Sequence, residues 1–255
     1  MRNRFLDSIV AAVALLAFAP GMLAKTAQQS GAARTPPDLS GIWTALPGGD
    51  IPGFGFTREA PPMLPWAEAR YKAAREGTRT PFDHPKDDVD PNLHCIPVGP
   101  TRIFTISGRP IEIIQTPSRV LLLFEWDHQM RRIYLDGRKM PDGYPPSYMG
   151  YSTGQWDGDT LVVETIGLND LTWIDSLGHS HSDALRIVER FRRVNHDTLE
   201  IDFLFDDPKA YATPWTGKKI LRLRPDWEFL EHTVCEDHLL EDHLPKMPTR
   251  TIGPH

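Results

Sequence analysis

Runs of alternating apolar and polar residues follow one another through the second half of the chain, and they constrain its fold more than any other feature. Alternation of this kind over a few residues is typical of β-strands with one buried face. The predicted strands span residues 102–107, 111–115, 119–135, 160–165, 185–193, 198–205, 218–224 and 228–234. Short Asp, Asn and Gly turns join several of them, without crossover helices. The order therefore predicts an antiparallel meander.

About eight such strands can close into a lipocalin-like barrel with room for one small ligand, and a two-sheet sandwich is the alternative. We predict one all-β domain over residues 38–240. Pro and Gly, with 24 and 19 copies, are too frequent for a helical bundle. One helix is expected over residues 65–76, starting at Pro65 and followed by Gly77. It belongs to a loop-and-helix extension on the N-terminal side of the barrel.

The N-terminus has the features of a secretory signal peptide. Arg2 and Arg4 form a basic start, residues 9–19 are an apolar run, and small residues surround a cleavage point at Ala24. The run is too short to span a bilayer, although an uncleaved anchor is the alternative. We expect a signal peptide over 1–24, a disordered lead-in over 25–37 and a tail over 241–255. The mature protein is then periplasmic or secreted and has no membrane span.

Cysteine content and charge bear on the compartment and on the partners. The two cysteines, Cys95 and Cys235, indicate a disulfide in an oxidising compartment. A redox-active or nucleophilic thiol is the alternative, but neither cysteine lies in a Cys-x-x-Cys pair. The net charge of −6 lacks the basic footprint of a nucleic-acid-binding protein. From the charge we predict no nucleic-acid partner. The chain has no Gly-x-Gly-x-x-Gly or P-loop motif, so we also predict no cofactor.

Six short motifs occur together between residues 38 and 236. They are DLSGIW at 38–43, CIPVG at 95–99, IYLDGR at 133–138, GDTLVVET at 158–165, HSDAL at 181–185 and PWTG at 214–217. In these motifs the chain resembles a widespread family of exported, uncharacterised bacterial proteins. That resemblance implies export but no particular activity. The likeness of the predicted barrel to lipocalin-like proteins is one of fold and carries no function.

One motif resembles the site of a hydrolase. Residues 150–154 match the Gly-x-Ser-x-Gly elbow of α/β-hydrolases, with Ser152 as nucleophile. Prolines precede it, and a turn and a strand follow it, where the elbow needs a strand and then a helix. The context therefore favours a turn with two glycines over a hydrolase.

Two further groups resemble metal sites. His179 and His181 can share a strand face, as zinc ligands do, but residues 185 and 186 provide no acidic ligand. Asp88, Asp90 and Asn92 resemble a calcium loop that lacks its glycine and its closing glutamate. We predict no metal site.

The segment 119–135 has one clearly apolar face, which should point into the barrel. This face carries Leu122, Phe124, Trp126, His128, Met130, Arg132 and Tyr134. We therefore expect His128 and Arg132 inside, with Asp127 and Arg131 outside. The same alternation places Glu189 inside and Arg190 outside. Buried polar groups need partners, so these residues form either an Arg132–Glu189 core pair or the polar lining of a ligand cavity.

The segment 167–183 is long for a loop and rich in polar and aromatic residues, which is typical of lids over binding sites. Asp175 with His181 is its acid–base candidate, and a surface loop with turn-capping side chains is the alternative. The expected aromatic lining of the cavity, roofed by this loop, consists of Trp126, Tyr134, Tyr148, Trp156 and Trp173.

Three functions remain open. The first is binding of a small apolar or aromatic molecule in an internal cavity. The second is a cofactor-independent lyase, isomerase or hydratase that uses the same cavity. Its catalytic candidates are His128, Arg132, Glu189, Asp175 and His181. The third is an envelope interaction protein with a filled core.

Overall fold

The computed structural model describes residues 35–45, 53–81, 83–86, 89–106, 108–230 and 232. The predicted signal peptide at 1–24 and the predicted tail at 241–255 lie outside the described residues. So does most of the predicted lead-in at 25–37.

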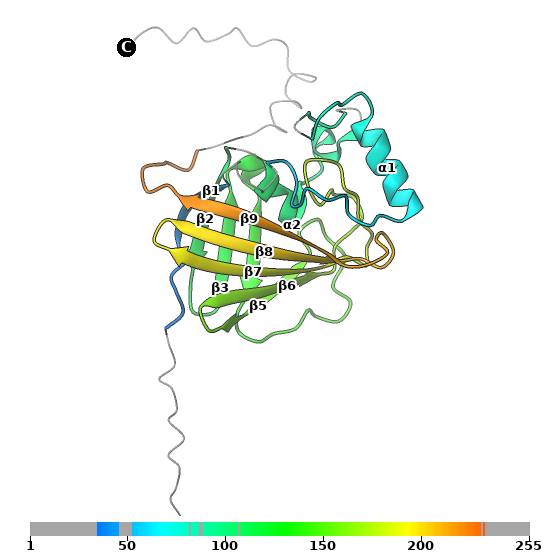
Figure 1. Ribbon diagram of the computed structural model, residues 1–255. Coiled ribbons are helices and arrows are strands. Elements are labelled where there is room, and N and C mark those ends of the chain that lie inside the picture. The colour runs from blue at the N-terminus through cyan, green and yellow to red at the C-terminus, as the bar shows by residue number, and fades with distance from the viewer. Residues whose placement is uncertain are drawn as a thin grey trace, which may run out of the picture. The chain divides into compact units, whose positions relative to one another are not determined.

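Within the described ranges, nine strands form a closed barrel in chain order (Figure 1). They are β1 (Gly41–Ala45), β2 (Pro110–Gln115), β3 (Arg119–Phe124), β4 (Met130–Tyr134), β5 (Tyr151–Asp157), β6 (Thr160–Ile166), β7 (Arg186–Asn195), β8 (Thr198–Asp206) and β9 (Trp215–Leu223). The barrel closes where β1 pairs with β9. The predicted all-β barrel is confirmed, with one strand more than the expected eight or so.

The meander is antiparallel at every strand pair but one. Strands β4 and β5 pair in parallel, and only through Ile133 with Ser152 and Tyr134 with Thr153. Antiparallel neighbours can be joined by tight hairpins, whereas parallel neighbours need a chain that returns to the starting end. The long connection 135–150 provides this return. The junction between β4 and β5 is therefore the most sparsely paired part of the barrel wall.

The connections differ between the two ends of the barrel. Tight turns join β2 to β3, β5 to β6 and β7 to β8 at one end. The strand pairings place the longer segments 53–64, 99–109, 167–185 and 207–214 at the opposite end, which we call the mouth. Long loops positioned by a rigid scaffold are where binding sites concentrate.

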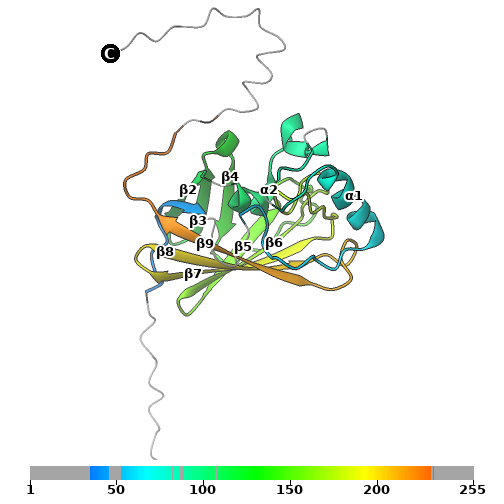
Figure 2. The ribbon, with the colours of Figure 1, turned by 45° about the horizontal axis from the view of Figure 1, so that its top comes forward.

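The predicted helix is present as α1 (Pro65–Arg75), and it lies outside the barrel wall (Figure 2). Pro65 suits a first turn because its missing N–H would have no partner there. An ion pair between Glu68 and Lys72 joins successive turns, and Ala67 and Ala74 are buried.

Two of the predicted strands are wrong. Residues 99–105 form α2 (Gly99–Arg102) and the 3-10 helix η3 (Ile103–Thr105). Here the adjacent residues Ile103 and Phe104 are both buried, so the alternation of a one-sided strand does not hold. The described part of the segment 228–234 contains no strand.

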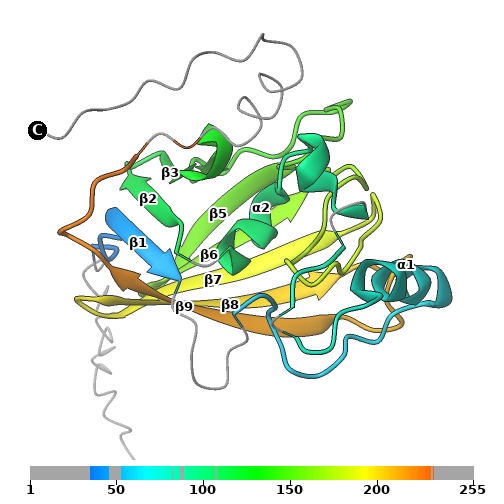
Figure 3. The same cartoon turned by 90° about the horizontal axis from the view of Figure 1, so that it is seen from above.

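The α2–η3 segment enters the barrel and fills its centre (Figure 3). Phe104 is fully buried and packs edge-on against Phe124, Phe191 and Phe203, with ring centroids 5.7–6.4 Å apart. Each of these side chains contributes about 1.5–3 kcal/mol by its burial. Aromatic side chains thus occupy the place where we expected an internal cavity.

The predicted strand 119–135 is a hairpin, and this changes which residues point inward. The 3-10 turn η4 (Trp126–His128) separates β3 from β4, with Asp127 and His128 at positive φ. The alternation restarts after the turn, and a shift of one residue reverses every side chain. Arg131 is therefore buried, whereas Arg132 and His128 are exposed. The predicted orientation of His128 and Arg132 was wrong.

The positions predicted on β7 are correct, because Glu189 is buried and Arg190 is exposed. Glu189 binds Arg131 rather than the expected Arg132. Arg131 donates Nη1 to Glu189 Oε1 at 2.8 Å and Nη2 to Glu189 Oε2. It also donates to Ser152 Oγ at 3.0 Å and to Thr165 Oγ1 at 2.6 Å. This network connects β4 to β7 inside the barrel.

Ser152, the serine of the Gly-x-Ser-x-Gly motif, lies within β5 and not on an elbow. Its hydroxyl is held by Arg131 and by Thr165, whose Oγ1 is 2.8 Å away. The structure therefore agrees with the sequence argument against a hydrolase elbow.

Replacing Glu189 with Gln is expected to destabilise the fold by about 3–5 kcal/mol, because Arg131 would remain buried without its counter-charge. Urea unfolding followed by tryptophan fluorescence measures this loss. The control is Arg190→Gln on the same strand, whose exposed ion pair with Asp157 is worth about 1 kcal/mol or less. Equal losses in the two variants would contradict the structural role of the buried pair.

Candidate functional site

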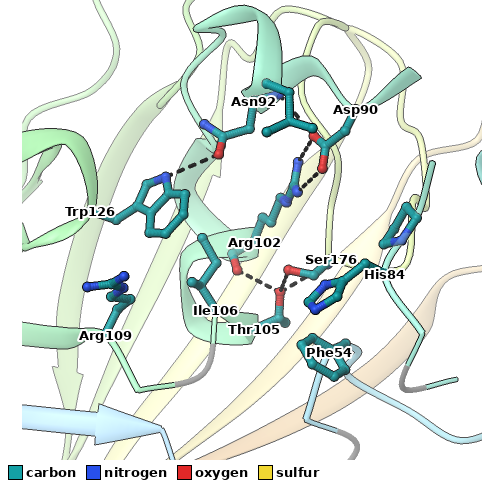
Figure 4. A pocket seen from close by; sticks show the side chains of 12 residues that line it. Phe54, His84, Asp90, Asn92, Arg102, Thr105, Ile106, Arg109, Trp126 and Ser176 are labelled. Atoms are coloured by element: carbon teal, nitrogen blue, oxygen red, sulfur yellow. Dashed lines mark hydrogen bonds and ion pairs between the residues drawn. The ribbon is translucent and has the colours of Figure 1, made fainter. Parts of the chain in front are cut away.

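An open pocket of about 390 Å³ lies at the mouth of the barrel (Figure 4). Its volume is within the range of small-molecule sites. The lining residues are Phe54, His84, Pro85, Asp90, Asn92, Leu93, Arg102, Thr105, Ile106, Arg109, Trp126 and Ser176. They come from segments that are distant in sequence, and the α2–η3 segment forms the floor. We call this hollow the mouth pocket.

An ion pair between Asp90 and Arg102 builds one wall of the mouth pocket. Asp90 caps the 3-10 helix η2 (Pro91–His94) by accepting a hydrogen bond from the Asn92 N–H. Its two carboxylate oxygens each accept a hydrogen bond from the Arg102 guanidinium. The guanidinium also lies over the Trp173 ring, 5.0 Å from its centre. A bidentate pair of this kind fixes both side chains.

Trp126 forms the facing wall and is held on several sides. Its Nε1–H donates to Asn92 Oδ1 at 3.2 Å. The His232 ring stacks on it with centroids 4.9 Å apart, and the Arg109 guanidinium lies 5.4 Å from its centre. Trp126 was predicted to contact the ligand, and it lines the pocket.

Two hydroxyl groups at the floor form a chain of defined direction. Thr105 donates its only hydroxyl proton to the Arg102 carbonyl oxygen at 2.6 Å. The 2.8 Å contact between Thr105 Oγ1 and Ser176 Oγ therefore has Ser176 as donor. Because its proton points to Thr105, Ser176 presents an acceptor oxygen and does not resemble a nucleophile held by a base.

A buried acid–base pair lies next to the wall formed by Ser176. Asp175 Oδ2 is 2.7 Å from Nδ1 of His179, and both residues are buried. The imidazole stacks on Tyr71, with ring centroids 4.4 Å apart. Lys219, also buried, donates to the Gly53 carbonyl oxygen at 3.1 Å. Burial lowers the pKa of Lys219 to about 8, although the nearby Asp175 carboxylate opposes the shift.

The expected pairing of Asp175 with His181 is wrong, because His181 has other partners. Its Nδ1 faces the Ser182 carbonyl oxygen at 2.9 Å, and its Nε2 lies 2.7 Å from the Thr172 hydroxyl. A neutral imidazole that donates from Nδ1 and accepts at Nε2 satisfies both contacts. Burial lowers the pKa of His181. These contacts give His181 a structural role.

The other predicted site residues do not gather at one place. Tyr134 and Arg132 line a separate hollow of about 150 Å³. Trp173 lines another hollow, of about 420 Å³, together with residues of α1. Trp156 packs against the core, and Tyr148 is half-buried. We place the candidate site in the mouth pocket because it combines apolar walls with two arginines and an imidazole.

Sequence reasoning missed His84, Arg102 and Arg109. Arg102 was placed in a predicted strand, and the other two residues lie in irregular segments. The only local signal for His84 is its position before a proline in a loop, which is too general to indicate a site. Asp90 was weighed as a calcium ligand, but it pairs with Arg102. In the described part of the chain, no cluster of three or more His, Cys, Asp or Glu side chains is arranged to hold a metal ion.

A scan against protein-family models found no matching family, and searches of curated proteins and of solved structures found no match. The resemblance to exported bacterial proteins therefore stays a prediction. None of the helices in the described ranges has the length and apolar character that a membrane crossing requires.

Stability should fall at acidic pH in a way that depends on His181. The pKa of His181 is lowered in the folded state by burial, whereas its unfolded value is about 6.5. Below about pH 6.5 the unfolded chain binds a proton that the folded protein excludes. The free energy of unfolding therefore decreases as the pH is lowered below this value. Urea unfolding at about pH 7.5 and about pH 5 should show a smaller fall for His181→Gln. The exposed His196→Gln variant should keep the wild-type fall, and a His181→Gln variant that also kept it would contradict this assignment.

Proposed function

We propose that this β-barrel protein binds a small molecule in the mouth pocket. The observation that carries the proposal is the pocket itself, a space of about 390 Å³ with Phe54, Leu93, Ile106 and Trp126 as apolar walls. A few polar groups converge on it, as is usual in small-molecule sites. The filled barrel centre moves the proposed site from the interior to the mouth.

The rigidity of the walls supports binding. Trp126 and Arg102 are each fixed by contacts from more than one segment, so little side-chain freedom is lost when a ligand enters. The floor is the packed α2–η3 segment. A preformed pocket of this kind favours a ligand with a flat apolar body that can lie against Trp126.

Filling the pocket should weaken binding. 1-Anilinonaphthalene-8-sulfonate is a suitable probe because it combines aromatic rings with an anionic group, and calorimetry measures its affinity. Leu93 lines the pocket and is partly exposed, so we expect Leu93→Trp to fold and to weaken binding by about 10-fold or more, equal to about 1.4 kcal/mol. The control is Val194→Trp, an exposed position at the far end of β7. Unchanged affinity in Leu93→Trp would mean that the probe binds elsewhere.

The buried Asp175–His179 pair favours a second candidate function, the cofactor-independent acid–base enzyme. A carboxylate that binds Nδ1 orients an imidazole and fixes its tautomer, as catalytic bases require. The pair lies next to Ser176, which lines the mouth pocket. Chemical turnover that is lost in His179→Gln, with ligand affinity retained, would favour the enzyme over the binding protein.

We also propose that the protein is exported and that Cys95 and Cys235 form a disulfide. Cys235 lies outside the described residues, and Cys95 is exposed. What supports the pairing is the even number of cysteines in a chain that has the features of an exported protein.

Titration with Ellman's reagent tests the disulfide. The denatured, non-reduced protein, isolated from an oxidising compartment, should show no free thiol, and two thiols should appear after reduction. Closing a loop of this length stabilises the fold by up to about 4–5 kcal/mol, so reduction should also lower the melting temperature. Two thiols without reduction would remove both the disulfide and its support for export.

A further inference from the structure

Among the described residues of the mouth pocket, several hydrogen-bond donors lack partners, whereas most acceptors are already paired. Arg109 lines the pocket with its side chain about one third exposed, and its one hydrogen bond in the described structure is a long contact of 3.5 Å to Glu125 Oε1. A guanidinium has five N–H donors, so most of them remain available. His84 is exposed and touches the Phe54 ring edge-on, at 5.3 Å between centroids. Its imidazole makes no hydrogen bond to the described residues.

The acceptors of the pocket are mostly engaged. Both oxygens of Asp90 accept from Arg102, and Asn92 Oδ1 accepts from Trp126. Thr105 Oγ1 accepts from Ser176 and donates to a carbonyl oxygen. Ser176 Oγ is the acceptor that this network leaves available. In addition, Arg102 Nε is buried and lacks a partner among the described residues. The pocket is thus rich in donors and short of acceptors.

The charges of the two arginines also favour a ligand with an acceptor group. Arg102 is neutralised by Asp90 through two short hydrogen bonds. Arg109, by contrast, meets Glu125 through one long contact, and Glu125 also accepts a hydrogen bond from the Leu230 N–H at 3.1 Å. Arg109 is therefore paired less closely with its carboxylate than Arg102 is, and it keeps N–H donors that face the pocket and have no partner among the described residues. A ligand oxyanion beside it would form charge-assisted hydrogen bonds, which are the strongest kind that the pocket can offer.

We propose that the ligand of the mouth pocket is a carboxylate on a flat aromatic or apolar body. This inference rests on the proposed function and specifies its ligand class. Arg109 binds the carboxylate, and His84 lies at the opposite side of the pocket, edge-on to Phe54 (Figure 4). Phe54, Leu93, Ile106 and Trp126 enclose the apolar body. Glu125 contacts Arg109 but does not line the pocket. Its carboxylate weakens anion binding, so it sets the affinity without contacting the ligand.

Three probes of similar shape separate charge from apolar contact. 2-Naphthoate carries an anionic acceptor, 2-acetylnaphthalene a neutral acceptor, and 2-methylnaphthalene no acceptor. Calorimetry or ligand-observed magnetic resonance measures each affinity with the full mature chain. We expect 2-naphthoate to bind at least about 10-fold more tightly than 2-methylnaphthalene, with 2-acetylnaphthalene between them.

Two variants with opposite effects test the assigned roles. Arg109→Gln should weaken 2-naphthoate by at least about 10-fold and leave 2-methylnaphthalene unchanged, because only the charge partner is lost. Glu125→Gln should strengthen 2-naphthoate by about 3-fold or more, because it removes the competing carboxylate and keeps an oxygen for the Leu230 N–H. Arg190→Gln, on the outside of the barrel, is the control for the loss of a positive charge.

The outcomes distinguish this inference from the proposed function. If 2-methylnaphthalene binds as tightly as 2-naphthoate, the ligand class is wrong and the binding pocket stands. If 2-naphthoate binds best but neither Arg109→Gln nor Glu125→Gln changes its affinity, the carboxylate is bound elsewhere and the inference fails. If none of the probes binds at concentrations up to its solubility limit, both the ligand class and the proposed function fail.

Discussion

The insertion of the α2–η3 segment into the barrel determines where a ligand can lie. A closed barrel of nine strands encloses a volume that must be filled by side chains or by a ligand. Phe104 fills it from within and packs against Phe124 on β3, Phe191 on β7 and Phe203 on β8. Protein interiors are packed to the density of organic crystals, so this cluster leaves no space for a second apolar body at the same place. The mouth pocket lies above this filled centre and is lined by Arg102 and Thr105 of the inserted segment.

The buried pair of Arg131 and Glu189 compensates for the weakest part of the barrel wall. Strands β4 and β5 share only two residue pairs, whereas β7 and β8 are paired along most of their length. Arg131 on β4 reaches across this junction to Ser152 on β5, Thr165 on β6 and Glu189 on β7. Such a pair offsets its desolvation only when its hydrogen bonds are complete, and here both side chains are nearly fully satisfied. Because Arg131 must reach all of these partners, the network also fixes which face of β4 points inward.

The two ends of the barrel have different roles. The far end carries tight turns, which set the register of the strands. The mouth carries the long segments that supply the donors and apolar walls of the pocket. In these segments polar side chains hold each other in place, as Asp90 holds Arg102 and as Asp175 holds His179. The mouth pocket is thus a set of irregular segments made rigid by buried polar contacts above a packed core.

The local sequence pattern was sufficient to predict the class of fold, the position of α1 and the positions of strands β6, β7 and β8. In these strands the alternation is long and uninterrupted, and Glu189 could be placed inside from its apolar neighbours alone. Alternation failed at the η4 turn, because a turn within a strand-like run reverses the faces of the residues after it, and this exchanged Arg131 with Arg132. It also failed at Phe104, where a segment buried on all sides needs no alternation.

The pocket residues His84, Arg102 and Arg109 were not predictable, because they are brought together by contacts between segments far apart in sequence. The sequence by itself determined that this chain forms an all-β domain, and the pairing of β1 with β9 in the structure decided that the domain closes into a barrel and not a sandwich. Only the tertiary structure decided which polar residues are buried and where a ligand can bind, because both depend on how separate segments pack.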